Sequence, residues 1–404
     1  MDQVYNPVSE FYTNYKFNNL PVIQCANYED VLNKAKSVNS SCILYNKNKN
    51  VVTDKNLQIN FSYDSKIEVI LILNVELKGS STLKISGKNY ALSNIYFVDG
   101  NKSFKVPSFF VEISAENLKL INFSMLNVRC GSPDVDYICV KTSAKNFQMY
   151  NSSLNGKFNN GVFLRLDFPL NNYIKCCAFQ NFNKVSAANG GETIRMATSQ
   201  YEKNNANCVI DQCYFNKCLG DPEVVSVKCS GNTVKNCIFE NNDTCKLVLR
   251  HAHNTNVNNC YFSGSGMRVY GTNHLIENIQ LVNDANILLD NKSGSSYVKA
   301  ENVKVNNVYY ENVKTPVTNN GKNCTVTNVT KGLKITKNDL LSPKPVDPTP
   351  IDPIDPTPID PVDPTIPKII IIPETVDPTK IYKLNPNLSA SQVNEILDQF
   401  ELKI

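Results

Sequence analysis

A nine-residue pattern recurs through the middle of the chain and constrains its fold more than any other feature. Each copy starts with Asn or Gly, alternates apolar and polar residues, and ends on Phe, Leu or Met. The eight clear copies are NYALSNIYF (89–97), NLKLINFSM (117–125), NFQMYNSSL (146–154), NNYIKCCAF (171–179), NCVIDQCYF (207–215), GNTVKNCIF (231–239), NTNVNNCYF (254–262) and NHLIENIQL (273–281). Successive copies begin 19–36 residues apart, and a looser copy lies near 298–305. Such short alternating segments predict β-strands, and none has the apolar spacing of a helix.

Strand-bearing units of this length that repeat many times are typical of a parallel β-helix, in which each coil is stable only when stacked on its neighbours. We therefore predict an all-β fold, a right-handed parallel β-helix. Residues at one repeat position should then form ladders inside the coils, and two such sets are Cys177, Cys213, Cys237 and Cys260, and Phe179, Phe215, Phe239 and Phe262. We interpret these cysteines as small buried apolar residues. Disulfides among the 14 cysteines are the alternative.

Asparagine is unusually common, at 58 of 404 residues, and it begins most copies of the repeat. Because Asn tolerates left-handed backbone conformations, we expect the Asn at the start of each copy to lie in a turn.

The chain divides into four predicted parts: an N-terminal extension (1–21), the β-helix (22–342), a Pro- and Asp-rich extended linker (343–380) and a short helical tail (381–404). Within the second part, residues 27–38 predict a short helix, N-capped by Asn27, that covers the N-terminal end of the coils. An ordinary surface helix is the alternative. The tail helix has an apolar stripe and is expected to dock on an unknown partner or to self-associate, with a frayed tail as the alternative.

The charge balance excludes some classes of protein. There are 41 Lys and Arg against 37 Asp and Glu, a net charge of +4, which does not suggest a nucleic-acid-binding protein. Residues 343–404 carry ten acidic and five basic residues, and a tail charge of −5 leaves +9 on the rest. A basic body suits an anionic ligand. No apolar run reaches 18 residues, so no membrane span is expected.

Three segments contain residues suited to chemistry: NGGETIRMATS (189–199), DPEVVSVKC (221–229) and LVLRHAH (247–253). The spacings of 32 residues from Asn189 to Asp221 and 22 from Lys228 to Arg250 each match one coil. The segments should therefore lie side by side on successive coils, about 4.8 Å apart. Taken singly, each of these residues is more simply a surface group, and only their stacking indicates a functional patch.

An amide and two carboxylates in this patch, those of Asn189, Asp221 and Glu223, are oxygen ligands suited to Ca²⁺. Asp221 and Glu223 share a face if their segment is extended. Lys228 is five residues beyond Glu223, so strict alternation would place it on the opposite face. A bend between them is needed if both line one cleft, and the alternation in LVLR allows Arg250 to point outward.

Several motifs together resemble polysaccharide lyase family 6, which comprises the alginate lyases and chondroitinase B. They are NGGETIR, EVVSVK followed by GNTVKNCIF, LVLRH, and GMRVYGTNHLIENI, preceded by YEDVLNKAK, CILYNKN and TLKISGKNYALSNIYFVDG. The similarity covers roughly residues 22–330 and leaves the linker and tail outside. It implies an enzyme that cleaves a uronate-containing anionic polysaccharide by β-elimination.

The resemblance also implies roles for individual residues. These are Ca²⁺ binding by Asn189, Asp221 and Glu223, a Brønsted base in Lys228, an acid near the leaving oxygen in Arg250, and substrate contacts from Arg195 and His251. The chain departs from the family pattern in three places. Asp221 stands where Glu is common, and Ala197 and Ala252 replace glycines.

Physical chemistry supports these roles. The C5 proton of a uronate is weakly acidic because the adjacent carboxylate is already negative, and a bound Ca²⁺ would neutralise that carboxylate. A neutral amine must then take the proton, and nearby positive charges favour the neutral form of Lys228. A guanidinium is a poor acid, so electrostatic assistance by Arg250 describes its role equally well.

Three other interpretations stay open. A pectinase-type glycoside hydrolase would need clustered Asp residues, and the body of the chain has no Asp-Asp cluster. A non-catalytic glycan-binding or fibre protein of a virus or cell surface suits the linker and tail. A degenerate lyase that only binds glycan lies between these two. Among substrates, alginate and dermatan or chondroitin sulfate remain, and GNTVKNCIF and GMRVYGTNHLIENI resemble the alginate branch more closely.

The expected substrate suggests action outside the cell or on a particle. The first twenty residues have neither the basic nor the apolar region of a secretory signal peptide. The place of action is therefore left open by the sequence.

Overall fold

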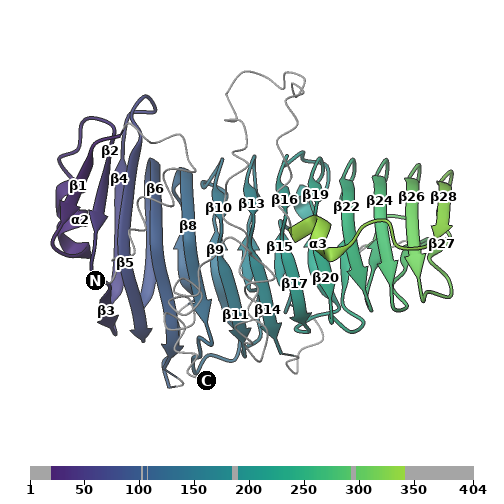
Figure 1. Ribbon diagram of the computed structural model, residues 1–404, viewed down its shortest axis with the longest axis horizontal. Helices are drawn as coiled ribbons and strands as arrows, with labels where there is room; N and C mark the ends of the chain where they lie inside the picture. Colours follow the sequence, from purple (N-terminus) through teal and green to yellow (C-terminus); the bar gives the residue numbers. More distant parts are fainter. Residues whose placement is uncertain (1–19, 102, 107, 184–189, 293–296, 342–404) are drawn as a thin grey trace.

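The computed structural model describes residues 20–101, 103–106, 108–183, 190–292 and 297–341. The strands pair in parallel and stack coil upon coil along the long axis, from β1 (Val22–Cys25) to β28 (Thr325–Lys331) (Figure 1). The predicted all-β parallel β-helix is confirmed. The predicted linker and tail lie outside the described residues, and so does almost all of the N-terminal extension.

Each complete coil contributes strands to three faces. The first face holds β1, β2 (Cys42–Asn46), β10 (Gln148–Tyr150), β13 (Tyr173–Lys175), β16 (Val209–Asp211) and β19 (Thr233–Lys235). The second face holds β3 (Asn50–Thr53), β11 (Ser153–Lys157), β14 (Ala178–Phe182), β17 (Tyr214–Cys218) and β20 (Ile238–Glu240). Longer strands run from the first face into the second: β5 (Val69–Gly79), β8 (Glu116–Leu126), β22 (Asn256–Ser263), β24 (Leu275–Val282), β26 (Lys304–Glu311) and β28.

The third face carries the candidate site. It holds β4 (Asn56–Ser62), β7 (Phe109–Ile113), β9 (Asp136–Val140), β12 (Leu164–Leu166), β15 (Ile194–Met196), β18 (Glu223–Val227), β21 (Lys246–Leu249), β23 (Met267–Val269), β25 (Ile287–Leu289) and β27 (Val317–Asn319). One long strand, β6 (Thr82–Gly100), passes through all three faces and joins them.

The repeat positions form ladders in the core, as the sequence predicts. The rings of Phe179, Phe215, Phe239 and Phe262 stack with centroids 4.6–5.2 Å apart and planes within 8° of parallel. The four matching cysteines are buried, and each Sγ lies near backbone carbonyl oxygens. All fourteen cysteines are free, so the alternative of a disulfide framework is wrong for this structure.

The asparagines have left-handed backbone at the corners where the chain passes from one face to the next, in turns or within long strands such as β6, which confirms the left-handed conformation expected of them. Asn89 and Asn94, the first and sixth residues of their copy, have φ of 62° and 59°, and most other copies repeat this pair of positive angles. The side chains also bond to one another from coil to coil. The Nδ2 of Asn117 donates to Asn89, and that of Asn146 to Asn117, at 2.6 and 2.7 Å. A polar ladder at the corners of the coils therefore runs parallel to the apolar ladders inside.

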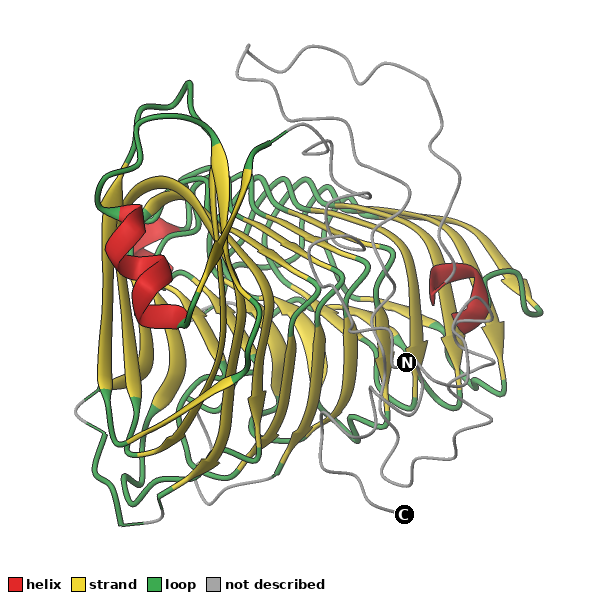
Figure 2. Cartoon of the chain, turned by 60° about the vertical axis from the view of Figure 1, so that its left-hand side comes forward, coloured by secondary structure: helices red, strands yellow, loops and turns green. Residues whose placement is uncertain are grey.

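Two helices pack against the described coils, one at the N-terminal end and one on the second face. At the N-terminal end α2 (Tyr28–Ala35) begins at Asn27, whose side chain accepts a hydrogen bond from Asp30 N at 2.9 Å. Its buried side chains, among them Val31, join the main core, so it covers the end of the coils as predicted (Figure 2). After β28 the chain turns back across the second face into α3 (Lys337–Leu341), which the sequence did not predict. Among the described residues, no helix is both long enough and apolar enough to cross a membrane.

Candidate active site

The three segments singled out in the sequence lie on successive coils of the third face. Met196 at the end of β15 pairs with Val227 of β18, which pairs with Leu249 of β21. Lys228 and Arg250 directly follow these last two residues, and therefore leave neighbouring strands at the same edge of the face. The spacing of one coil between segments is confirmed.

A β-bulge supplies the bend that the sequence required between Glu223 and Lys228. The register of β18 against β21 shifts between Glu223 and Val225, so that Glu223 pairs with Lys246 and Val225 with Leu247. The extra residue, Val224, resets the alternation of side chains. Both Glu223 and Lys228 can therefore face outward from one strand.

Glu223 and Arg250 form an ion pair on this surface. Arg250 NH1 lies 3.1 Å from Glu223 Oε1, and the two side chains are 18% and 13% exposed. Burial raises the pKa of the Glu223 carboxyl, and the charge of Glu192 adds to this, while Arg250 and Lys228 counteract it. Glu223 Oε2 is buried and makes no hydrogen bond within the described structure. One carboxylate oxygen is thus left for another ligand.

Asp221 lies in the turn before β18 and is buried. Its Oδ1 accepts a hydrogen bond from Glu223 N at 3.0 Å, and its Oδ2 accepts a longer one from Gly191 N at 3.4 Å. Burial, followed by the charge of Glu192, raises the pKa of the Asp221 carboxyl. The site therefore concentrates carboxylates that are costly to hold without a cation.

The third predicted oxygen ligand, Asn189, lies outside the described residues. Within the described ranges, no three His, Cys, Asp or Glu side chains are grouped as a metal site. The donor chemistry nevertheless fits a hard cation, since Asp221 and Glu223 offer carboxylate oxygens and one of these oxygens is buried without a partner.

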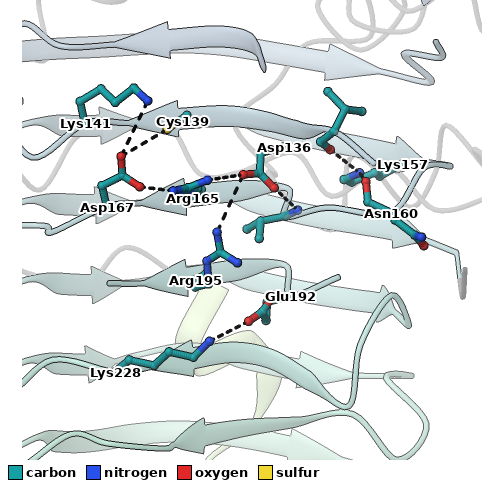
Figure 3. A network of polar contacts seen from close by, with 12 residues as sticks. Asp136, Cys139, Lys141, Lys157, Asn160, Arg165, Asp167, Glu192, Arg195 and Lys228 are labelled. Carbon is teal, nitrogen blue, oxygen red and sulfur yellow. Dashed lines mark hydrogen bonds and ion pairs between the residues drawn. The ribbon is translucent and has the colours of Figure 1, made fainter. Parts of the chain in front are cut away.

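Lys228 is paired with a carboxylate that sequence reasoning missed. Its Nζ lies 3.0 Å from Glu192 Oε1, and Figure 3 shows the two side chains pointing toward each other from adjacent coils. Glu192 is only 1% exposed, and its Oε2 has no hydrogen-bond partner in the described part of the chain. Its place in NGGETIR, three residues after Asn189, was the available signal. The sequence could not show that this Glu is buried against Lys228.

Arg195 lies on β15 beside the site. Its NH2 lies 3.9 Å from Asp136 Oδ2, a loose contact at the edge of a charged network that also includes Arg165 and Asp167 (Figure 3). Among the described residues Asp136 is the only carboxylate within ion-pair distance of Arg195. Its position is consistent with the predicted substrate contact.

His251 follows Arg250 and is buried. Burial lowers the pKa of its imidazole, although the Glu202 carboxylate opposes this shift. Its Nδ1 is 3.6 Å from Glu202 Oε2, too long for a hydrogen bond, while the same carboxylate lies 3.2 Å from His253 Nε2. Sequence reasoning missed Glu202, because it lies in another coil and no motif marks it.

Comparison with solved structures finds the same fold in several polysaccharide lyases. The PL6 family alginate lyase AlyGC is 17% identical with a TM-score of 0.59, over 77% of this chain and 53% of that one. A mannuronic acid specific family 6 lyase from human gut microbiota is 15% identical with a TM-score of 0.58, over 78% and 83%. The PL6 family lyase Pedsa3628 from Pseudopedobacter saltans is 14% identical with a TM-score of 0.56, over 86% and 98%. The chain thus spans about half the length of AlyGC and most of the other two.

Sequence identities this low establish only a shared fold. The family assignment rests on a match to a sequence profile. No curated protein sequence matches the chain significantly. A family profile described as Chondroitinase B matches residues 54–335, well over half of the chain and including every described residue of the candidate site. The resemblance noted in the motifs is therefore confirmed. The chain belongs to the chondroitinase B family of polysaccharide lyases.

Proposed function

We propose that this protein is a Ca²⁺-dependent lyase that cleaves a uronate-containing polysaccharide by β-elimination. The observation that carries the proposal is the placement of Lys228 and Arg250 at the same edge of two paired strands, beside the Glu223 carboxylate. An amine and a guanidinium at one edge of a β-helix face can serve the two ends of the bond-breaking step, proton removal and departure of the leaving oxygen.

In the proposed reaction Lys228 Nζ takes the C5 proton of the uronate. The C–H electron pair forms the C4–C5 double bond as the bond from C4 to the glycosidic oxygen breaks. Arg250 stabilises that oxygen as it leaves, and the oxygen takes a proton from the guanidinium or from water. The Lys228 ammonium then releases the C5 proton to solvent. Lys228 must first leave its ion pair with Glu192 and lose a proton, since an ammonium cannot accept one.

Asp221 and Glu223, together with Asn189, would hold the Ca²⁺ ion. The Glu223 Oε2, which has no hydrogen-bond partner in the described part of the chain, and the buried Asp221 carboxylate support this assignment. When bound, the ion would supply positive charge to the uronate carboxylate and so acidify the C5 proton. The shorter Asp at position 221 predicts weaker binding than a Glu would give.

We place alginate first among substrates and dermatan or chondroitin sulfate second. Two of the structural relatives are described as alginate or mannuronic acid lyases, and another family 6 alginate lyase was solved with a trisaccharide. The family profile is named for chondroitinase B, so dermatan and chondroitin sulfate stay among the candidate substrates. All of these substrates carry uronates, so the proposed chemistry is common to them.

The proposal is tested by incubating the protein with alginate, dermatan sulfate, chondroitin sulfate and polygalacturonate, each with Ca²⁺ or with a chelator. Ultraviolet absorbance of the unsaturated uronate should rise with one polymer, disappear with the chelator, and return when Ca²⁺ is added back. Indifference to the chelator would remove the metal from the proposal. New reducing ends without absorbance would indicate hydrolysis.

A second candidate is a glycan-binding protein built on the lyase fold. The buried ion pair of Lys228 with Glu192 favours it, because the pair occupies the amine that catalysis needs. This candidate predicts retention of the protein on a uronate-polymer column without any product. It also predicts that Lys228→Ala leaves this retention unchanged.

A further inference from the structure

The two ends of the coil stack differ in how the core is covered. At the N-terminal end β1 has a free edge, but the buried side chains of α2, among them Val31, cover the core there. At the C-terminal end β28 pairs with β26 on one side, and within the described residues no strand pairs with its other side. Figure 1 shows β27 and β28 at the right-hand end, with α3 further back along the stack. The last coil therefore presents an open strand edge.

The apolar ladders of the core are left uncovered at this open edge. The strands β22, β24, β26 and β28 each have two apolar residues, three apart, at matched positions. In β26 these are Val305 and Val308, which are at most 1% exposed. Their partners in the last coil are Val326, which is only partly buried, and Val329, which is 38% exposed. One more layer of apolar side chains would bury both valines as the earlier coils bury theirs.

A segment suited to that layer occurs later in the same chain. Residues 342–404 lie outside the described structure, and their sequence contains four consecutive isoleucines, Ile369–Ile372. Isoleucine has a high preference for β-strands, and an exposed run of four invites aggregation. Pro367 and Pro373 stand on either side. Because proline has no backbone N–H, these two residues limit the strand to 368–372 and favour a place at the edge of a sheet.

The chain is long enough to bring this segment to the open edge. After β28 it folds back over the second face, where Ile335 joins a buried cluster that includes Ile238 of β20. From β20 to β28 there are four strand spacings of about 4.8 Å, or about 19 Å. The 27 residues from 342 to 368 span on the order of 80 Å when extended at about 3.1 Å per residue. The linker therefore reaches β28 with length to spare.

Charge favours the same docking. Residues 297–341, which form the last coils and α3, hold seven lysines and three acidic residues, a net charge of +4. Residues 342–368 hold five aspartates and two lysines, a net charge of −3. The two segments should attract each other. A tethered segment also has an effective concentration on the order of mM, which favours the chain's own isoleucines over those of a second copy.

We propose that Ile369–Ile372 of the same chain pairs with the open edge of β28 and covers Val326 and Val329. The added strand would satisfy the free backbone groups of β28 and complete the core at its C-terminal end. It would also remove an edge on which a second molecule could pair. Arg250 directly follows β21, three strands from β27, so this closure is separate from the candidate active site.

Hydrogen exchange in the full-length protein tests the pairing. The variant combines Ile370→Asp with Ile371→Asp, which puts a charge on both faces of the proposed strand. The control combines Ile351→Asp with Ile354→Asp and adds the same charge within the linker. We expect the β28 amides that point away from β26 to exchange at least about tenfold faster in the variant, and at the wild-type rate in the control. Unchanged exchange in β16 would show that the coils stay folded. Equal β28 exchange in all three proteins would overturn the proposal.

Crosslinking determines which copy supplies the segment. Cys324 directly precedes β28 and is the only one of the fourteen cysteines that is not buried. Mild oxidation of Ile370→Cys should therefore join position 370 to Cys324 within one chain, at least about fivefold faster than Ile354→Cys joins position 354. A disulfide that links two chains would assign the edge to a second copy and contradict the proposal. Equal rates for the two positions would show that the isoleucines do not dock there.

Discussion

The interior ladders and the third-face site are built on the same coils and follow opposite rules. In the interior, Phe215 and its neighbours in the ladder stack as identical residues, each in the position of the one before. On the third face, the residues at matched positions differ from coil to coil: Asp167, Ala197, Lys228 and Arg250 follow one another after paired strands. Repetition therefore specifies the fold, and departures from repetition specify the chemistry.

The difference also appears in the burial of charge. The site keeps the carboxylates of Glu192 and Glu223 largely buried, each with an oxygen that has no partner among the described residues, whereas the ladders bury neutral side chains. Such an arrangement is costly for the folded state and is typical of functional sites. Neutral substitutions in the site should therefore lower activity more than stability. Substitutions in the ladders should lower stability more than activity.

The largest effect is expected from Lys228→Ala. Loss of a general base should lower turnover by about 10³-fold or more, because no other described amine lies at the same edge of β18. The melting temperature should fall by a few degrees, because the variant leaves the buried Glu192 carboxylate without its cation, but the coils should stay folded. Ultraviolet absorbance of the product measures turnover, and thermal melting measures stability. Lys84→Ala is the control for both measurements. Unfolding of Lys228→Ala would mean that the residue is structural.

The matched interior substitution, Phe215→Ala, should give the opposite result. Removing a fully buried ring between two stacked neighbours should lower the free energy of unfolding by about 3–5 kcal/mol. Activity per folded molecule should be close to wild type. Denaturant unfolding measures the loss, and Phe168→Ala, at a partly buried ring pair outside this ladder, should cost less. Equal losses in the two variants would show that the ladder adds nothing.

His274 predicts a pH dependence of stability, and His251, whose pKa burial also lowers, contributes in the same direction. The Nδ1 of His274 accepts a hydrogen bond from Thr255 N and its Nε2 lies 2.8 Å from Tyr270 O, so no acceptor faces a second proton. Burial lowers the pKa of His274 from 6.5 to about 4. Above pH 6.5 the imidazole is neutral in both states and contributes nothing; as the pH falls toward 4, the unfolded state alone gains a proton.

Stability should therefore fall on the order of 3 kcal/mol between these pH values because of this group. Urea unfolding at pH 7.5, 5.5 and 4 measures the slope in wild type and in His274→Gln. The variant should be less stable at pH 7.5 but should show a flatter dependence. An unchanged slope would assign the acid sensitivity to other groups.

The smallest effect is expected in the turns, from Asn146. Its φ is 55°, its Nδ2 donates to Asn117, and its Oδ1 accepts from Asn171. Asn146→Ala should cost about 1–2 kcal/mol through the strained backbone and the broken ladder. Asn146→Gly keeps the backbone freedom and loses only the amide bonds, so it should cost less. Chemical unfolding of both variants separates the contribution of the left-handed backbone from that of the amide hydrogen bonds. Equal losses in the two variants would mean that only the amide hydrogen bonds contribute.

The sequence was sufficient to predict the fold because the same strand pattern recurs in many copies. Copies aligned on Asn and Phe predicted parallel strands, left-handed backbone and stacked cores. The helix capped by Asn27 was predicted separately, from its N-cap and the spacing of its apolar residues. The spacing of one coil placed Lys228 and Arg250 on adjacent coils. The helix α3 was missed because its five residues carry too short a pattern to distinguish a helix from a turn.

The finer geometry of the site depends on contacts that no local pattern records. The need for a bend between Glu223 and Lys228 could be deduced, but the bulge at Val224 depends on pairing with the next coil. The Glu192 contact with Lys228 joins residues 36 apart, and the reach of Lys246 to Asn286 spans 40. Residue identities alone cannot state which carboxylates become buried together.

The most direct measurement is the ultraviolet absorbance of unsaturated uronate when the wild-type protein is incubated with alginate and Ca²⁺, alongside Lys228→Ala at equal concentration. The account predicts a rise for wild type and none for the variant, with both proteins folded. No rise with alginate or with any other uronate polymer, by a folded wild-type protein supplied with Ca²⁺, would contradict it.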